Sequence, residues 1–158
     1  MSRDPLAFLS DDVMKLNRAK LEAAGFNGTL RSGQHNSEKG WLVFRGVRKY
    51  YKSKWEMNYA HYLEWLRSKN EIVDWEYEPE IFWFDKIRRG VTNYTPDFKV
   101  TTFAAGIEYH EVKGYMDPKS KTKLARMKKY HPEVRMVLIE RPQIAAIAQY
   151  RSMIPGWR

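Results

Sequence analysis

The stretch YTPDF at residues 94–98 begins one apolar run, and EVKG at residues 111–114 ends the next. Asp97 follows a proline at the start of the first run, fourteen positions before Glu111. Side chains alternate between the two faces of a strand, so Glu111 and Lys113 should point the same way and Val112 the other way. Two carboxylates and one ammonium on paired strands would form a divalent-metal site with a cation beside it.

The segments around these two runs predict one sheet with helices packed on it. Residues 53–69 carry apolar side chains at helical spacing, and Ser53 with Glu56 forms a capping-box pattern. Hairpin-joined strands followed by a crossover helix predict an α/β fold, with a mixed central β-sheet flanked by helices. We expect strands at residues 75–84, 94–102, 107–113 and 134–139, and further helices at 117–130 and 142–150.

The N-terminal part of the chain has a different character. A partial apolar stripe from Ser10 to Ala24 predicts a helix that Gly25 would end. Residues 25–40 are rich in Gly, Ser and Asn and predict a mobile linker. We therefore expect an N-terminal helix and flexible linker at residues 1–45 and a single compact domain at residues 46–158.

Composition limits the classes of function. The 158 residues make one domain of ordinary size, and a 43% apolar share with six tryptophans supports a real core. The absence of cysteine excludes disulfides, thiolate zinc sites and cysteine nucleophiles, and it fits a reducing cytoplasm. We find no membrane-length apolar run and no leader, so we expect no membrane partner. A net charge of +9 favours a polyanion, with nucleic acid ahead of an anionic membrane surface.

The two acids and the lysine suit phosphodiester cleavage, which needs a neutralised phosphate, an activated water and a stabilised leaving oxygen. Hard oxygen ligands favour Mg²⁺ or Mn²⁺ over zinc. We expect metal ligands from Asp97, Glu111 and the main-chain carbonyl of Val112. Lys113 would orient the water or neutralise charge, because an ammonium beside two carboxylates should stay protonated. The alternative is that Asp97 is an ordinary acid at the end of a strand and that Glu111 and Lys113 form a solvated pair. On its own, so short a pattern more often indicates this alternative.

These residues resemble the signature of the PD-(D/E)xK nuclease superfamily over about residues 50–140. Pro96-Asp97 matches its first half, and residues 111–113 match its second half. The resemblance implies a restriction-endonuclease-like core (αβββαβ), so that residues 46–158 are the nuclease domain behind an N-terminal helical extension. It also implies a catalytic, metal-binding acid on the helix before the sheet. Glu56 is the match, and its alternative role is the capping box.

Within the superfamily, the chain looks most like the Holliday junction resolvases of the archaeal type and of the phage endonuclease I type. Residues 94–98, residues 111–114 and the later His131-Pro132-Glu133 carry this likeness. It implies a homodimer in the cytoplasm, or in the host cytoplasm if phage-encoded. Such a dimer would nick opposing strands of four-way DNA junctions with Mg²⁺, or with Mn²⁺ in its place, and leave 5′-phosphates. The first forty-five residues do not match, which leaves the dimer geometry open.

Two other functions stay open on the sequence. One is a DNA endonuclease of the same chemistry with another substrate, of the restriction, repair or general phage kind. The other is a catalytically silent nucleic-acid-binding module. Comparison of branched and linear substrates separates the first from a resolvase, and a Mg²⁺ titration without turnover would favour the second.

Positive charge is concentrated on the helix predicted at residues 117–130, where six cations repel one another unless an anion is near. Aromatic residues at helical and strand spacing are predicted to lie mainly in the core. His110 alternates away from Glu111 and is predicted to be structural. The predicted DNA-contacting residues are Lys49, Lys52, Ser53, Lys54, Arg88, Arg89, Tyr115, Lys119, Lys121, Lys123, Arg126 and Lys128.

Overall fold

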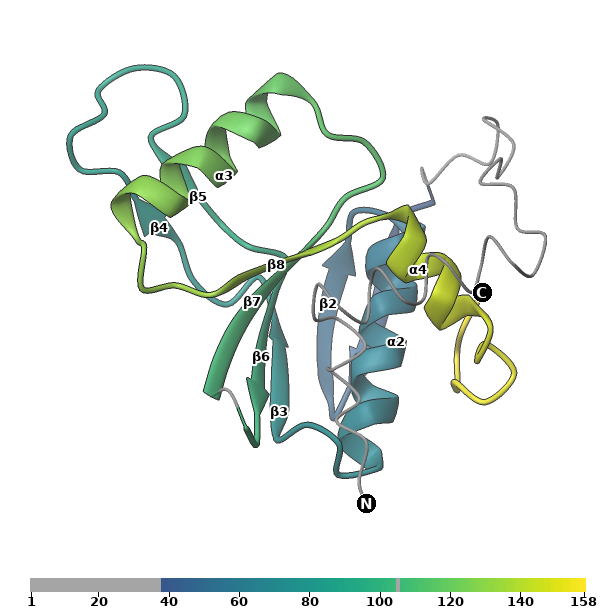
Figure 1. Cartoon of the computed structure of the whole chain (residues 1–158). Helices are drawn as coiled ribbons and strands as arrows, with labels where there is room; N and C mark the ends of the chain where they lie inside the picture. The colour runs from purple at the N-terminus through teal and green to yellow at the C-terminus, as the bar shows by residue number, and fades with distance from the viewer. Residues whose placement is uncertain (1–37, 105) are drawn as a thin grey trace.

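The computed structural model describes residues 38–104 and 106–158, and it shows an α/β fold built on a mixed four-stranded sheet (Figure 1). The first two pairs of neighbouring strands in the sheet are antiparallel, and the last pair is parallel. The expected mixed central sheet flanked by helices is therefore confirmed. In spatial order the strands are β3 (Asp74–Tyr77), β6 (Phe98–Thr102), β7 (Gly106–Val112) and β8 (Met136–Ile139).

Along the chain, one helix is followed by β3, β6 and β7 of the central sheet, and then by a second helix and β8. Ser53 caps the first described helix by accepting a hydrogen bond from Glu56 N, and Asp117 caps the next with Pro118 in its first turn. In Figure 1 α4 lies beside α2 at one side of the molecule, whereas α3 lies on the other side with β4 and β5. The three helices are α2 (Lys54–Ser68), α3 (Pro118–Tyr130) and α4 (Arg141–Ala148).

Two of the predicted strands are wrong in length, because each is interrupted by a backbone feature. The run at residues 75–84 breaks where Glu78 has a φ of 46° and Pro79 has no N–H. The run at residues 94–102 breaks at Pro96, so that Tyr94 and Phe98 belong to different sheets. The freed pieces form a separate two-stranded sheet of β4 (Phe82–Trp83) and β5 (Asn93–Tyr94).

A hairpin that the sequence analysis does not predict precedes α2. Its turn residues Arg45 and Gly46 both have positive φ, of 51° and 78°, which is the pattern of a two-residue type I′ turn. Leu42 and Tyr51 from its inner face are buried in the main core. The expected boundary at residue 45 is therefore wrong, since it would cut the paired strands β1 (Gly40–Phe44) and β2 (Val47–Tyr51).

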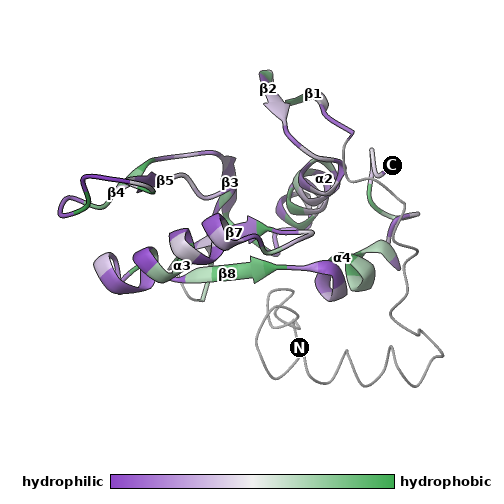
Figure 2. Ribbon diagram, turned by 90° about the horizontal axis from the view of Figure 1, so that it is seen from above, coloured by the Kyte–Doolittle hydropathy of each residue, from purple (hydrophilic) through white to green (hydrophobic). Residues whose placement is uncertain are grey.

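Two cores hold these elements together. The main core joins the inner face of the hairpin, the buried side of α2, the sheet and α4. A smaller core of Phe84, Tyr94 and Met127 joins the β4–β5 sheet to α3. Figure 2 shows β8 as largely hydrophobic and α3 as largely hydrophilic, as expected for a helix that buries few side chains. The predicted N-terminal helix lies outside the described residues, as does most of the predicted linker. Within residues 38–104 and 106–158, no helix is long and apolar enough to cross a membrane.

Candidate active site at one end of the central sheet

The two predicted acids lie opposite each other at one end of the sheet. Phe98 of β6 is paired with His110 of β7, and the same antiparallel register places Asp97 across from Glu111. The backbone confirms this closeness, because Val112 N donates a hydrogen bond to Asp97 Oδ2 over 2.8 Å. A hairpin-sized gap in the sequence therefore brings the two acids together at one end of the two central strands.

Lys113 joins this pair. Its Nζ lies 3.4 Å from Glu111 Oε1, which confirms that the two side chains share a face. Glu111 is only 6% exposed, so it is not the solvated partner of a surface ion pair. The Lys113 ammonium thus lies against the buried Glu111 carboxylate and is close enough to Asp97 to lower its pKa.

Glu56 at the start of α2 has its carboxylate held by three donors. Its Oε2 accepts hydrogen bonds from Lys52 N and from the Tyr77 hydroxyl, at 3.0 and 2.6 Å. Its Oε1 accepts a hydrogen bond from Ser53 Oγ at 3.0 Å. Ser53 therefore caps the helix while Glu56 accepts from Lys52 N, one residue before the expected capping-box donor, and the Glu56 carboxylate is held close enough to Asp97 to raise its pKa.

Two tyrosines that the sequence analysis assigns no site role hold the acids in place. The buried Tyr94 hydroxyl donates to Glu111 Oε2 over 2.5 Å, and Tyr77 donates to Glu56 as described. Burial, together with the neighbouring carboxylate, raises the pKa of both phenols, so they remain neutral donors. Tyr94 opens the YTPDF stretch, but only the tertiary structure shows that its ring reaches the next strand.

The site has an excess of negative charge. Burial, Glu111 and Glu56 raise the pKa of Asp97 well above its usual value. The Val112 N–H and the Lys113 ammonium act in the opposite direction, but they do not cancel the increase. An additional cation would therefore stabilise the ionised form of Asp97 more than it would stabilise an ordinary surface aspartate.

The donor set fits a hard divalent cation in its chemistry, although not as a cluster of three free acids. In the described part of the chain, no group of three or more His, Cys, Asp or Glu side chains is arranged to hold a metal ion. The available donors are the carboxylates of Asp97 and Glu111 and the main-chain carbonyl of Val112 at the end of β7. Oxygen donors of this kind, with a raised carboxylate pKa beside them, suit Mg²⁺ or Mn²⁺.

The predicted DNA-contacting residues differ in how far they are engaged within the protein. Ser53 caps α2, Lys49 Nζ donates to Tyr77 O over 2.6 Å, and Arg126 donates to the Val91 carbonyl. The Lys52 ammonium donates to Glu78 although its side chain is exposed, and Lys54 Nζ lies 3.8 Å from Glu38 Oε2. Lys54 and Lys123 are half-buried, and Lys123 Nζ lies 5.8 Å from the centre of the Tyr94 ring. The others have exposed side chains and are Lys52, Arg88, Arg89, Tyr115, Lys119, Lys121 and Lys128.

His110 is structural, as predicted. It is fully buried and lies within hydrogen-bonding distance of the Tyr59 hydroxyl (2.7 Å) and of Glu108 Oε2 (3.1 Å). Arg135 completes this group with an ion pair to Glu108 Oε1 at 2.9 Å. The network lies on the face of β7 opposite to Glu111 and ties the sheet to α2.

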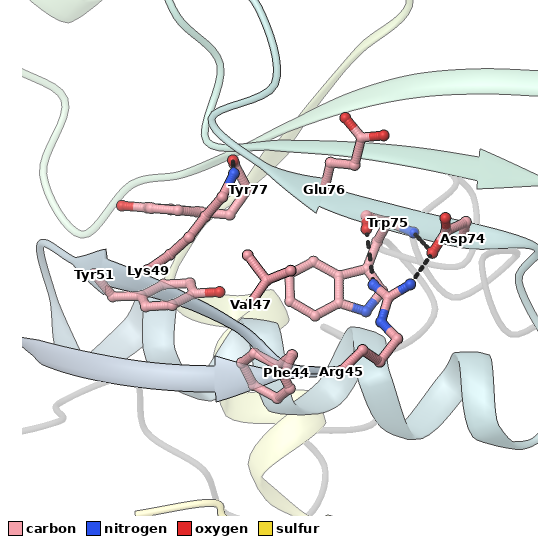
Figure 3. A pocket seen from close by; sticks show the side chains of 9 residues that line it. All are labelled: Phe44, Arg45, Val47, Lys49, Tyr51, Asp74, Trp75, Glu76 and Tyr77. Atoms are coloured by element: carbon pink, nitrogen blue, oxygen red, sulfur yellow. Dashed lines mark hydrogen bonds and ion pairs between the residues drawn. The ribbon is translucent and has the colours of Figure 1, made fainter.

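Two hollows lie beside the elements that carry the site, and of its acids and lysine only Glu111 lines one of them. A cavity of about 420 Å³ separates the hairpin from the free edge of β3, and Figure 3 shows Arg45 and Lys49 reaching across it to main-chain carbonyls of that strand. A second cavity of about 350 Å³ lies between β8 and α3 and is lined by Glu111 and Lys128 among largely apolar side chains. The acids thus lie between a hairpin on one side and a basic helix on the other.

Comparison of this chain with protein-family models, with curated proteins and with solved structures finds no match. The features of this chain that bear on its function are the carboxylate pair of Asp97 and Glu111, the neighbouring Lys113 ammonium and the surrounding cations.

Proposed function

We propose that this protein is a metal-dependent, structure-selective DNA endonuclease with a restriction-endonuclease-like core. The observation that carries the proposal is the juxtaposition of Asp97 and Glu111 across β6 and β7, with the Lys113 ammonium 3.4 Å from Glu111. Two carboxylates and one ammonium match the needs of phosphodiester hydrolysis, in which charge is neutralised and water is positioned. The resemblance of these residues to the PD-(D/E)xK signature supports the same reaction.

Each residue has a separate task in this proposal. Asp97, Glu111 and the carbonyl of Val112 would hold Mg²⁺, which supplies Lewis acidity and an acidified water when bound. Lys113 faces the same side as Glu111 and orients the attacking water or neutralises charge on the phosphate. Glu56 adds negative charge beside Asp97 and fixes the start of α2.

The proposed substrate is branched DNA, most specifically a four-way junction nicked on opposing strands to leave 5′-phosphates. The net charge of +9 supports a polyanionic partner, and the exposed cations of α3 begin just after the lysine of the site. Two symmetric cuts need two symmetric sites, so we further propose a homodimer.

The deciding experiment is cleavage of labelled four-way junctions with Mg²⁺, with linear duplex as the control substrate. Asp97→Asn is expected to abolish cleavage and to keep junction binding, because it removes a metal ligand without adding bulk. Glu71→Gln is the charge-matched control, since Glu71 lies beyond the opposite end of α2 from Glu56. Cleavage by Asp97→Asn at the wild-type rate would overturn the proposal.

Other DNA substrates test which DNA structure the proposed enzyme prefers. Flap, nicked and linear DNA in the same assay separate a junction resolvase from an endonuclease of another target class. A Mg²⁺ and Mn²⁺ titration without turnover on any of them would instead indicate a silent binding module. Light scattering at the concentrations used for cleavage tests the dimer, and a monomer there would refute that part of the proposal.

A further inference from the structure

The outer face of the β1–β2 hairpin carries an exposed cluster of aromatic, aliphatic and cationic side chains. The register pairs Trp41 with Tyr50 and Val43 with Arg48, and directly paired residues share one face of the hairpin. The three apolar members are 55%, 43% and 61% exposed, in the order Trp41, Tyr50 and Val43. The inner face, by contrast, buries Leu42 and Tyr51 in the main core.

The rings of this cluster are ordered by their neighbours. The centroids of the Trp41 and Tyr50 rings lie 5.3 Å apart at 64°, in an edge-to-face arrangement. The guanidinium of Arg48 lies 4.4 Å from the centre of the Trp41 ring. A cation that packs against a ring in this way leaves a rigid surface of aromatic and guanidinium planes open to solvent.

Along the sequence, the hairpin and its flanks carry one sign of charge. From Lys39 to Trp55 the chain contains no Asp or Glu, and it carries the cations Lys39, Arg45, Arg48, Lys49, Lys52 and Lys54. Three of these cations pair with acids of other segments: Arg45 with Glu64 and Asp74, Lys52 with Glu78, and Lys54 with Glu38. An anionic partner that also presents flat rings therefore fits this face. An acidic protein segment would satisfy the charges but would leave the aromatic surfaces without partners.

The cluster adjoins the proposed active site along the chain. Tyr50 lies two residues before Lys52, about 7 Å away along an extended strand. Lys52 donates to Glu78, and its pKa is raised by that hydrogen bond and further by Glu56 and Asp97. The effect of Asp97 and Glu56 on Lys52 places this end of the hairpin beside the acid site.

We infer that the outer face of the hairpin, formed by Trp41, Val43, Arg48 and Tyr50, binds unpaired nucleobases by stacking, next to the acid site. The inference rests on the proposed function, and it narrows the substrate to DNA with unpaired or splayed bases near the cut. Base stacking on aromatic and arginine planes is the usual means of holding single-stranded nucleic acid. Paired duplex hides its base faces and would gain only the electrostatic contacts.

The test measures DNA affinity in EDTA, so that it does not depend on cleavage. Wild-type chain and the Trp41→Leu, Trp41→Phe and Tyr50→Leu variants are titrated with a fluorescent single strand and with the matched duplex. We expect the leucine variants to lose ten- to a hundredfold in single-strand affinity and little in duplex affinity. Trp41→Phe keeps a ring and should recover most of the loss. The salt dependence of binding should stay unchanged, because no phosphate contact is removed.

Phe103→Leu is the matched control, since Phe103 is a 68% exposed aromatic residue in the β6–β7 turn, at the end of those strands away from Asp97. It should bind both DNAs as the wild type does. Equal single-strand affinity in all variants would overturn the inference, even if junctions are cleaved. Aromatic-dependent binding without any Mg²⁺-dependent cleavage would instead refute the proposed function and leave the inference standing. A dimer that Trp41→Leu converts to a monomer would show that a second copy covers this face, and it would also overturn the inference.

Discussion

The hydroxyl of Tyr94 on β5 donates a hydrogen bond to the carboxylate of Glu111 on β7, and Asp97 lies between these two strands in the sequence. The ring of Tyr94 belongs to the smaller core beneath α3, whereas its hydroxyl belongs to the acid site. This one side chain therefore connects the placement of the basic helix to the orientation of a proposed metal ligand.

Tyr94→Phe should lower cleavage by about ten- to a hundredfold, which is the usual effect of removing a partner that orients a metal ligand. The ring stays in its core, so the fold should lose only about 1 kcal/mol. Tyr109→Phe is the control, because Tyr109 lies two residues before Glu111 on β7 and donates in the same way, but to Glu80 and not to one of the three acids of the site. The measurement is the cleavage rate as a function of Mg²⁺ concentration. Equal rates for the two variants would show that the Tyr94 bond has no part in catalysis.

Lys113→Met should reduce the cleavage rate by about 10²- to 10³-fold while leaving DNA affinity nearly unchanged. The ammonium of Lys113 also lowers the pKa of Asp97, so its loss should move the acidic limb of the pH–rate profile to higher pH. Lys99→Met is a close control, because the side chains of Lys99 and Lys113 are both 27% exposed and each pairs with one glutamate. If the pH–rate profile of Lys113→Met is the same as that of the wild type, Lys113 does not influence the titration of Asp97 during catalysis.

The sequence predicts this chemistry because alternation along a strand and a hairpin-sized gap are local rules. Those rules place Asp97, Glu111 and Lys113 together without knowledge of the rest of the chain. They do not reveal Tyr77 or Tyr94, because a tyrosine in a strand looks the same whether its hydroxyl faces solvent or a carboxylate. The contact is decided by packing between segments far apart in the sequence.

The missed hairpin has a different cause. A two-residue turn is normally recognised by Asn-Gly or Asp-Gly, and here Arg45 takes the first position with a positive φ. Its guanidinium donates to Asp74 and to the carbonyl of Trp75, so bonds to β3 support a turn conformation that its sequence does not favour. The predictions of single strands at residues 75–84 and 94–102 are wrong for a local reason. Breaks at Glu78 and Pro96 interrupt these runs although the residues on both sides have good strand propensity.

Stability should depend on pH and metal through Asp97. Its pKa is raised in the folded state, mainly by burial and then by Glu111, so between the unfolded and folded pKa values the folded chain binds more protons than the unfolded chain. In EDTA the free energy of unfolding should therefore decrease as the pH rises through the pKa of Asp97 in the folded state. Mg²⁺ should restore the lost stability. Asp97→Asn should raise the melting temperature in EDTA at pH 7.5 by a few degrees and remove the response to Mg²⁺. Calorimetric scans across pH, with and without metal, check both parts. A wild-type melting temperature that rises with pH in EDTA would contradict the account.

Lys49 gives a direct test of which predicted cations support the fold and which contact DNA. Its Nζ donates to the carbonyl of Tyr77 across the cavity between the hairpin and β3, so Lys49→Met should cost about 1.5–3 kcal/mol of unfolding free energy. Lys86→Met removes an exposed lysine in the β4–β5 connection and should change stability by less than about 0.5 kcal/mol. Urea unfolding followed by tryptophan fluorescence measures both. If Lys49→Met is as stable as the wild type but binds DNA less tightly, the lysine is a phosphate contact and not a tether. If it is destabilised while the salt dependence of DNA binding stays unchanged, the cation holds the hairpin and its outer face in register with the acid site.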